Sequence, residues 1–177
     1  MLLRHTLILA ALAPQAALAD CAIPAYVRSE VPGAPAILAA PEAGAEQVGV
    51  VPMANDSERG MMGGHALITD IRHGYAAVTQ VAAWDNPDRT GPDGWVSTAD
   101  LVFVAQTQKG FAAPDAASQL LWQGQDWIYP DMIATLAACD GEWVALTLVD
   151  GSPTAPFWVR GICAGQETTC DGVGGDY

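Results

Sequence analysis

Few side chains in this 177-residue sequence are spaced for catalysis or for metal binding. His65 and His73 are eight positions apart, which on one extended strand separates them by about 26 Å, too far to share a metal ion. The run Asp85-Asn86-Pro87-Asp88 has the composition of a calcium loop, but Pro87 takes the place of the third ligand. These spacings predict no metal site and no bound cofactor.

The motifs of the common enzyme classes are also missing. The sequence has no Gly-x-Ser-x-Gly nucleophile motif. Gly60-Met61-Met62-Gly63-Gly64 is rich in glycine, but it lacks the Lys and the Ser or Thr of a phosphate-binding loop, so we expect a flexible loop there. Carboxylates are plentiful, but none is marked out by an apolar setting suited to acid catalysis. We therefore expect a protein that is not an enzyme.

Cysteine is the residue type whose chemistry is clearest. An even number of cysteines in an exported chain predicts two disulfides, and four cysteines allow three pairings. Cys163 and Cys170 are separated by a short loop of small and polar residues that closes easily. We favour Cys163–Cys170, which leaves Cys21–Cys139 to tie the N-terminal segment to the second part of the chain.

The aromatic side chains are candidates for ligand contact. Six tryptophans are a large share of the aromatic residues, and a small barrel cannot bury every large ring. Rings left at the surface form a groove for an extended peptide or for the face of a sugar. The alternative is that they pack between two structural units. The candidate ligand-binding residues are Tyr75, Trp84, Trp122, Trp127 and Tyr129, whereas Trp143 and Trp158 follow apolar alternation and are expected in the core.

Residues 1–19 have the pattern of a secretory signal peptide. A basic start is followed by a short apolar run and by Ala17-Leu18-Ala19, which predicts cleavage after Ala19. Asp20 stands before Cys21, where a lipoprotein signal needs a small residue. No later apolar stretch approaches the ~20 residues of a membrane helix. We expect a periplasmic or secreted protein that does not insert into the membrane after cleavage.

The charge excludes two classes of partner. The formal net charge is −13 at pH 7, so the chain cannot neutralise phosphates. Nucleic acid and anionic lipid surfaces are therefore not expected to bind. An acidic surface serves solubility, and it also suits a basic partner.

The elements that must position these residues occur twice. Ala39-Ala40-Pro41-Glu42-Ala43-Gly44-Ala45 recurs as Ala112-Ala113-Pro114-Asp115-Ala116-Ala117-Ser118, and each copy continues through short β-branched runs to a Trp-Val pair. Aligning Ile68 with Ile133 gives the first copy two longer connections, one between Met53 and His65 and one between Val78 and Trp95. Enlarged loops can carry function, although drift in a surface loop is commoner.

The order of these runs resembles the bacterial SH3-like domain family. Val48-Gly49-Val50-Val51 and Gly94-Trp95-Val96 match its strands in the first copy, and Trp143-Val144 and Trp158-Val159 match them in the second. In that family the closing Gly-Trp-Val leads into a short helical turn. The family's basic residue and asparagine are absent at Ile37-Leu38-Ala39-Ala40, so their ligand contacts are not carried over.

This resemblance implies an all-β protein of two tandem small SH3-like β-barrels. The expected boundaries are a signal peptide at 1–19, an N-terminal lead at 20–33, one domain at 34–106, a second at 107–166 and a flexible tail at 167–177. Its implied function is that of an exported noncatalytic binding module for a peptide, peptidoglycan or an envelope protein. The alternative is a structural or assembly protein of the cell envelope that acts through a protein–protein interface.

Overall fold

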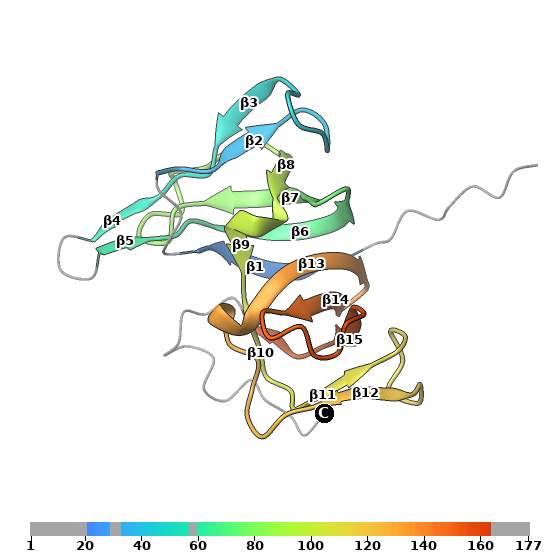
Figure 1. Ribbon diagram of the computed structural model, residues 1–177. Helices are drawn as coiled ribbons and strands as arrows, with labels where there is room; N and C mark the ends of the chain where they lie inside the picture. Colours follow the sequence, from blue (N-terminus) through green and yellow to red (C-terminus); the bar gives the residue numbers. More distant parts are fainter. Residues whose placement is uncertain (1–20, 29–32, 57–59, 164–177) are drawn as a thin grey trace, which may run out of the picture.

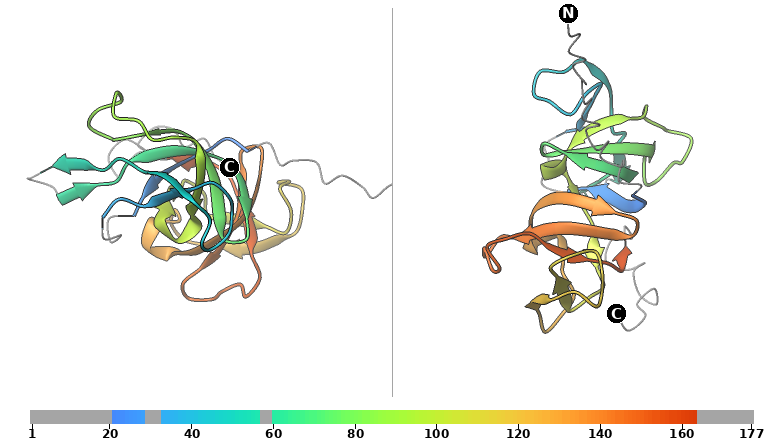
Figure 2. Two further views of the ribbon diagram at one scale, coloured as in Figure 1. Left: turned by 90° about the horizontal axis from the view of Figure 1, so that it is seen from above. Right: turned by 90° about the vertical axis from the view of Figure 1, so that its right-hand side faces the viewer.

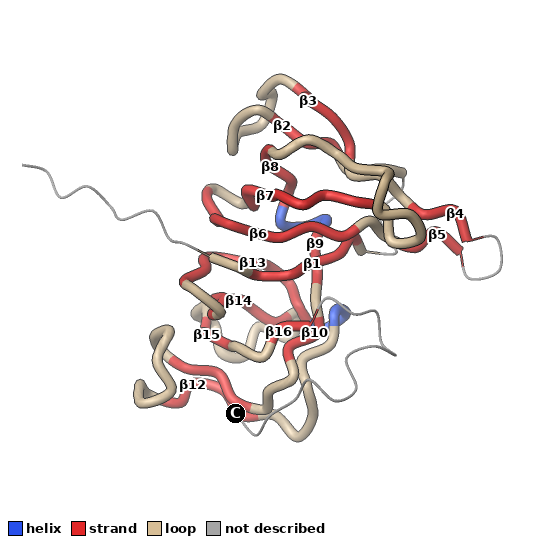
Figure 3. Tube along the Cα trace, turned by 180° about the vertical axis from the view of Figure 1, so that it is seen from behind, coloured by secondary structure: helices blue, strands red, loops and turns tan. Residues whose placement is uncertain are grey.

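The computed structural model describes residues 21–28, 33–56 and 60–163, and these residues form an all-β protein (Figure 1). The predicted all-β class is confirmed. The helical structure in this part of the chain is limited to two single turns of 3-10 helix, η1 (Thr98–Asp100) and η2 (Pro130–Met132) (Figure 3). No helix there is long and apolar enough to cross a membrane. The predicted signal peptide, the predicted tail and Cys170 lie outside the described residues.

The first half of the chain forms a seven-stranded sheet with the order β3-β2-β8-β7-β6-β1-β9. Its strands are β1 (Ile23–Val27), β2 (Ala36–Leu38), β3 (Gln47–Val50), β6 (His65–Arg72), β7 (Tyr75–Ala82), β8 (Gly94–Ser97) and β9 (Leu101–Val102). A separate hairpin of β4 (Ala54–Asp56) and β5 (Gly60–Met62) projects from its side, so the expected flexible loop at Gly60–Gly64 begins as a strand (Figure 1).

The segment expected to be a lead is an integral part of this sheet. β1 lies within residues 20–33, and it pairs antiparallel with β6 on one side and with β9 on the other. The predicted boundary at residue 34 therefore leaves out a strand of the first sheet. Pro24 pairs with Leu67 in the ladder, although a proline in the sequence usually indicates an edge strand or a segment that is not a strand.

The second half forms a five-stranded sheet with the order β12-β11-β15-β14-β13. Its strands are β11 (Lys109–Phe111), β12 (Leu120–Gln123), β13 (Ile133–Asp140), β14 (Trp143–Leu148) and β15 (Phe157–Val159). Two short strands form a separate antiparallel pair. They are β10 (Val104–Ala105), which comes directly after the first sheet in the chain, and β16 (Ile162–Cys163), the last described strand. The strand pairing leaves both sheets open, with β3 and β9 at the edges of one and β12 and β13 at the edges of the other.

The hairpins β2–β3 and β11–β12 have the same register. Ala36 pairs with Val50 in the first, and Lys109 pairs with Gln123 in the second, which places corresponding residues 73 positions apart (109 − 36). Both hairpins have a register shift before their last pair, and both turns are closed by the same backbone bond. The N–H of Ala39 donates to the backbone carbonyl of Glu46 in one turn, and the N–H of Ala112 donates to the backbone carbonyl of Gln119 in the other.

The hairpins β6–β7 and β13–β14 correspond in the same way, and they correct one alignment made from the sequence. Ile68 pairs with Val78, whereas Leu136 pairs with Leu146. Ile68 therefore corresponds to Leu136 and not to Ile133. Two apolar residues three positions apart (136 − 133) cannot be told apart by pattern, and the strand pairing decides between them.

One pair of core positions holds a large and a small residue in both halves, but the large residue is on opposite strands in the two halves. In the first half Ile37 packs over Gly94, where an added Cβ would lie 2.5 Å from Cγ2 of the isoleucine. In the second half the position of Ile37 is taken by Gly110 and that of Gly94 by Phe157. A Cβ on Gly110 would collide with the Phe157 ring. The same space is filled in both halves, from opposite strands.

One hydrophobic core runs through both halves. Its buried residues include Ile23 and Ile68 of the first sheet together with Leu136 and Val144 of the second. Figures 1 and 2 show the two sheets stacked, with β1 and β13 at the junction. The predicted disulfide Cys21–Cys139 is confirmed at this junction. The two halves therefore share much more than this link.

Arg28, at the end of β1, adds polar contacts across the same junction. Its Nε donates to the carbonyl oxygen of Ala99 at 3.1 Å, Nη1 to that of Pro130 at 3.0 Å and Nη2 to that of Ile133 at 2.7 Å. One guanidinium thus joins η1 of the first half to η2 and β13 of the second. Hydrogen bonds from a charged donor contribute more than neutral ones, so the contact favours one relative placement of the halves.

Candidate functional site

The five aromatic residues predicted to bind a ligand do not share one groove. Tyr75 is the first residue of β7, and Trp84 follows the end of that strand. Nine residues of extended chain span about 25–30 Å, so the two rings lie at opposite ends of the first sheet. The remaining three belong to the second half.

Each of those three rings has its own surroundings. Trp122 stacks on Phe157 with ring centroids 5.5 Å apart, and it packs against the main core. Trp127 packs against Val104 and Cys163. Tyr129 is 37% exposed and precedes η2. Trp122 and Trp127 therefore act mainly in packing.

Trp143 and Trp158 are not core residues, and the prediction that they are is wrong. Trp158 lies between the buried Phe157 and Val159, and Trp143 precedes the buried Val144, so both side chains face the outer side of the second sheet and are only partly buried. There Trp143 meets Phe111 edge to face at 5.8 Å, and the guanidinium of Arg160 lies 5.2 Å from the centre of the Trp143 ring. Apolar alternation identified the strand correctly but assigned the wrong face to the core.

Trp84 lines a pocket in the described part of the chain. The pocket has a volume of about 310 Å³ and lies against β1, β6 and the end of β7. His65 and Trp84 meet at right angles, with their planes at 89° and their centroids 5.9 Å apart, and form two adjoining walls. The lining residues are Pro24, Ala25, His65, Ala66, Leu67, Gln80 and Trp84.

A bulge in β7 brings Gln80 to this pocket. His65 pairs with Ala82 and Leu67 pairs with Thr79, so β7 has one residue more than β6 between these pairs. Gln80 takes up the extra length with a φ of 51°, a left-handed conformation that glycine usually supplies. Backbone strain of this kind is often found at binding sites, and here it sets the direction of a polar side chain.

The two long connections of the first half hold Trp84 in place. The N–H of Ala83 donates to the carbonyl of Arg89 at 2.9 Å, which closes the loop that carries Trp84. Arg89 then donates from Nη2 to the carbonyl of Met53 at 3.0 Å. Because Met53 leads into the β4–β5 hairpin, this bond ties one long connection to the other beside the pocket.

His65 has an unusual polar environment. Its Nδ1 is enclosed by protein and has no hydrogen-bond partner among the described residues. An enclosed N–H without a partner loses a strong interaction with water, so we assign the ring proton to Nε2. The sequence offered nothing to single out His65 or Gln80, because the bulge depends on the pairing of β7 with β6.

Within the described residues, no group of three or more His, Cys, Asp or Glu side chains could hold a metal ion. His65 begins β6 and His73 lies in the turn after that strand, so the two histidines are at opposite ends of it. Asp85, Asn86 and Asp88 lie in the turn next to Trp84, where Oδ1 of Asn86 accepts from the N–H of Asp88.

Comparison with known proteins gives no relative on which to base a function: no family model matches the chain, and no curated protein or solved structure matches it either.

Proposed function

We propose that this protein is an exported, noncatalytic binding module that recognises a peptide, peptidoglycan or an envelope protein at the His65–Trp84 pocket. The observation that carries the proposal is that the pocket combines β6 and β7, which have counterparts in the second half, with two segments that have none. These are β1, which supplies Pro24 and Ala25, and the long connection that supplies Trp84. At the positions of His65 and Gln80 the second half has the buried residues Ile133 and Leu148.

Export is supported by two separate features. The first is the predicted signal peptide at residues 1–19. The second is the disulfide between Cys21 and Cys139, a bond that persists in oxidising compartments. A periplasmic or secreted location agrees with both. Cys163 is not a free thiol, and its predicted partner Cys170 lies outside the described residues.

The proposal includes the descent of both halves from one SH3-like unit by duplication. Its support is the common register of corresponding hairpins, including the matching shifts in β2–β3 and β11–β12. In the first half, β8 leads into the single helical turn η1, as the resemblance to that family leads one to expect. In this view the second half keeps the simpler form and the first half has gained the pocket.

A retention experiment tests the function. Purified protein is applied to isolated cell wall and, separately, to immobilised envelope proteins. We expect Trp84→Ala to lose retention, because it removes one wall of the pocket. Trp158→Ala is the matched control, since it removes another partly buried tryptophan, one that belongs to the second sheet and does not line the pocket. Unchanged retention of Trp84→Ala, with both variants folded in thermal melts, would refute the pocket as the binding site.

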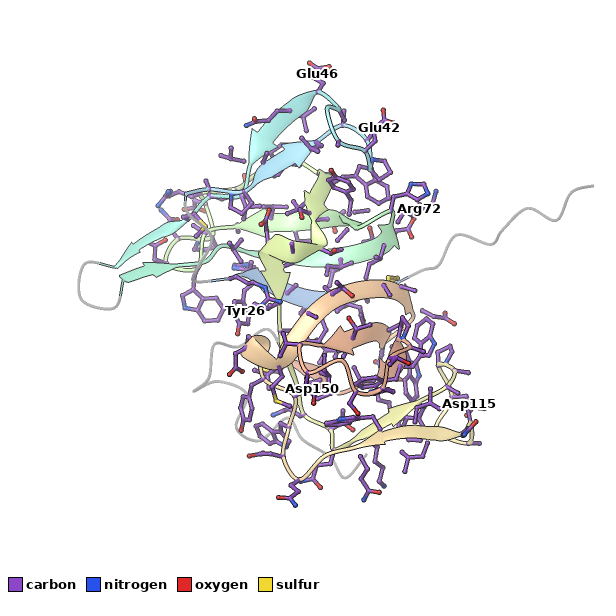
Figure 4. The ribbon with its side chains drawn as sticks, in the orientation of Figure 1. Tyr26, Glu42, Glu46, Arg72, Asp115 and Asp150 are labelled. Carbon is purple, nitrogen blue, oxygen red and sulfur yellow. A yellow bond between two sulfur atoms is a disulfide. The ribbon has the colours of Figure 1, made fainter. Side chains whose placement is uncertain are left out.

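One observation favours the alternative of an assembly role. The edge strand β3 exposes Val48 (45%) and Val50 (42%), and the edge strand β12 exposes Leu120 (43%). These strands lie at opposite ends of the molecule (Figure 1), and exposed apolar edges can add a strand from another chain. Figure 4 shows Glu42 and Glu46 at the tip of the β2–β3 hairpin, so a basic partner suits that end. A stoichiometric complex lost in Val50→Lys and kept in Trp84→Ala would support this role.

A further inference from the structure

We propose that the His65–Trp84 pocket takes the acetamido group of an N-acetylated amino sugar, with the sugar ring lying against Trp84. This inference rests on the proposed function and names the ligand class for its pocket. Four properties of the lining support it: volume, charge, polar groups and the state of the backbone beneath.

The volume suits one small unit. Small-molecule sites usually enclose about 300–1,000 Å³, and this pocket, at about 310 Å³, is at the lower end of that range. It can hold one sugar ring with a short substituent. Longer ligands must continue outside it.

The lining selects a neutral group. None of the seven lining residues is Asp, Glu, Lys or Arg, so the lining holds no carboxylate, ammonium or guanidinium group. A charged group buried here would have no charged partner, which is costly. The net charge of −13 further opposes anionic ligands.

The polar groups of the pocket match an amide. The side-chain amide of Gln80 offers both a donor and an acceptor, so it can either donate to the C=O or accept from the N–H of an acetamido group. Nε2–H of His65 is a second donor. The acetyl methyl then lies against Pro24, Ala25 and Leu67, which provide the apolar part of the lining. Trp84 is partly exposed and lines the pocket, so a sugar ring that enters the pocket can lie against it, a common use of aromatic side chains.

The backbone beneath the pocket argues against an extended peptide. Its floor is formed where β1 pairs with β6, with Pro24 opposite Leu67 and Ala25 opposite Ala66. The backbone donors and acceptors of these strands are used in their own ladder, so they cannot pair with a further strand. A peptide laid across the pocket would bring several amides to a surface with two polar side chains, whereas an acetamido group brings one.

The test is a titration with N-acetylglucosamine, followed by tryptophan fluorescence and by amide chemical shifts. Glucosamine, which is cationic, and glucose, which has no amide, serve as comparison ligands. We expect N-acetylglucosamine to bind about five- to tenfold more tightly than glucose, the usual effect of matched hydrogen bonds, and glucosamine to bind no better than glucose. Equal affinities for the three sugars, or no binding, would overturn the inference.

Gln80 provides a variant with a matched control. Gln80→Gly removes the amide, and glycine adopts the same positive φ without strain. His73→Gly makes the same change at a second non-glycine residue of positive φ in the described part of the chain, whose φ is 52° and which lies outside the pocket lining. We expect weaker binding of N-acetylglucosamine by Gln80→Gly, by about five- to tenfold, and no change in His73→Gly. Full binding by a folded Gln80→Gly would contradict the assignment, and Gln80→Asn provides the same test if the glycine variant does not fold.

The outcome for the sugar is separable from the outcome for the proposed function. If cell wall or a partner protein is retained in a Trp84-dependent manner but N-acetylglucosamine does not bind, the binding module stands and the sugar assignment fails. Trp84-dependent binding of a stem peptide free of sugar would have the same meaning. If Trp84→Ala changes none of these interactions, the pocket itself is excluded and both proposals fail.

Discussion

On β15, Phe157 and Val159 face the core and are fully buried, whereas Trp158 between them faces outward. We therefore expect Phe157→Ala to lower the free energy of unfolding by about 3–5 kcal/mol, as for buried aromatic residues in general. Trp158→Ala should cost less, about 1–2 kcal/mol, since that side chain lies on the outer face and is partly exposed. Urea unfolding of both variants measures the difference. Equal losses would place Trp158 in the core after all.

Asp100 links the stability of the junction to pH. Burial raises the pKa of its carboxyl group, and the nearby charge of Arg28 opposes that rise. A carboxyl with a raised pKa in the folded state favours folding when protonated, and this contribution is lost as the pH rises through its folded pKa. Asp100→Asn should therefore be at least as stable as the parent protein at neutral pH.

The pH dependence of that variant is the sharper measurement. Thermal melts from neutral to acidic pH should show the advantage of Asp100→Asn shrinking as the pH falls through the pKa of the carboxyl, because the parent then becomes neutral at this position too. An advantage that grows on acidification would mean that the ionised carboxylate stabilises the fold.

Single residues differ in how far their sequence context determines their role. Cys21 and Cys139 could be paired from the count of cysteines and the short spacing of the other two, because disulfide chemistry is simple to enumerate. Trp84 could be singled out by its type and its loop. Gln80 could not, since its left-handed backbone is fixed by a ladder between two strands and not by neighbours along the chain.

Among the elements, the pair Gly110 and Phe157 allows a test of how the two halves correspond. Gly110→Ile should be destabilising because its side chain meets the Phe157 ring, and overpacking of this kind typically costs about 1–3 kcal/mol. Phe157→Gly should cost at least about 3–5 kcal/mol through the cavity it leaves. The double variant recreates the arrangement of Ile37 over Gly94.

We expect that double variant to be more stable than the sum of the single changes predicts, by about 0.5–3 kcal/mol, the range seen for residues in contact. A double-mutant cycle in urea measures this coupling. Strict additivity would mean that the two positions do not share one space, and the correspondence with Ile37 and Gly94 would then be false at this point.

The elements themselves were largely predictable, and the exceptions have physical causes. Alternation of apolar residues predicted β6, β7, β14 and β15 because each has one buried face. β1 was missed because Pro24 interrupts a short run, and proline has no backbone N–H to donate to a ladder. The alignment of Ile68 with Ile133 was three residues off because Ile133 and Leu136 are both buried, so the apolar pattern alone fits either residue.

At the scale of the whole molecule, the two halves share one core, and we expect them to fold as one unit. The continuous core and the Arg28 contacts both join segments that the sequence assigned to separate domains. Non-local packing of this kind leaves no trace in local patterns, so the sequence predicted two units of the correct class but not their common core. A protein of this size with one core is expected to unfold in a single transition.

Removing the disulfide tests this unity. The Cys21–Cys139 bond closes a loop with a sequence separation of 118 residues. For a loop of this length, the chain-entropy account gives a stabilisation of about 4–5 kcal/mol. The double variant Cys21→Ser/Cys139→Ser should therefore melt at a much lower temperature, yet still in one transition, because the core that joins the halves is intact. Calorimetry measures both quantities, and agreement between the calorimetric and van't Hoff enthalpies marks a single transition. Two separate transitions in the variant would show that the bond, and not the shared core, makes the halves fold together.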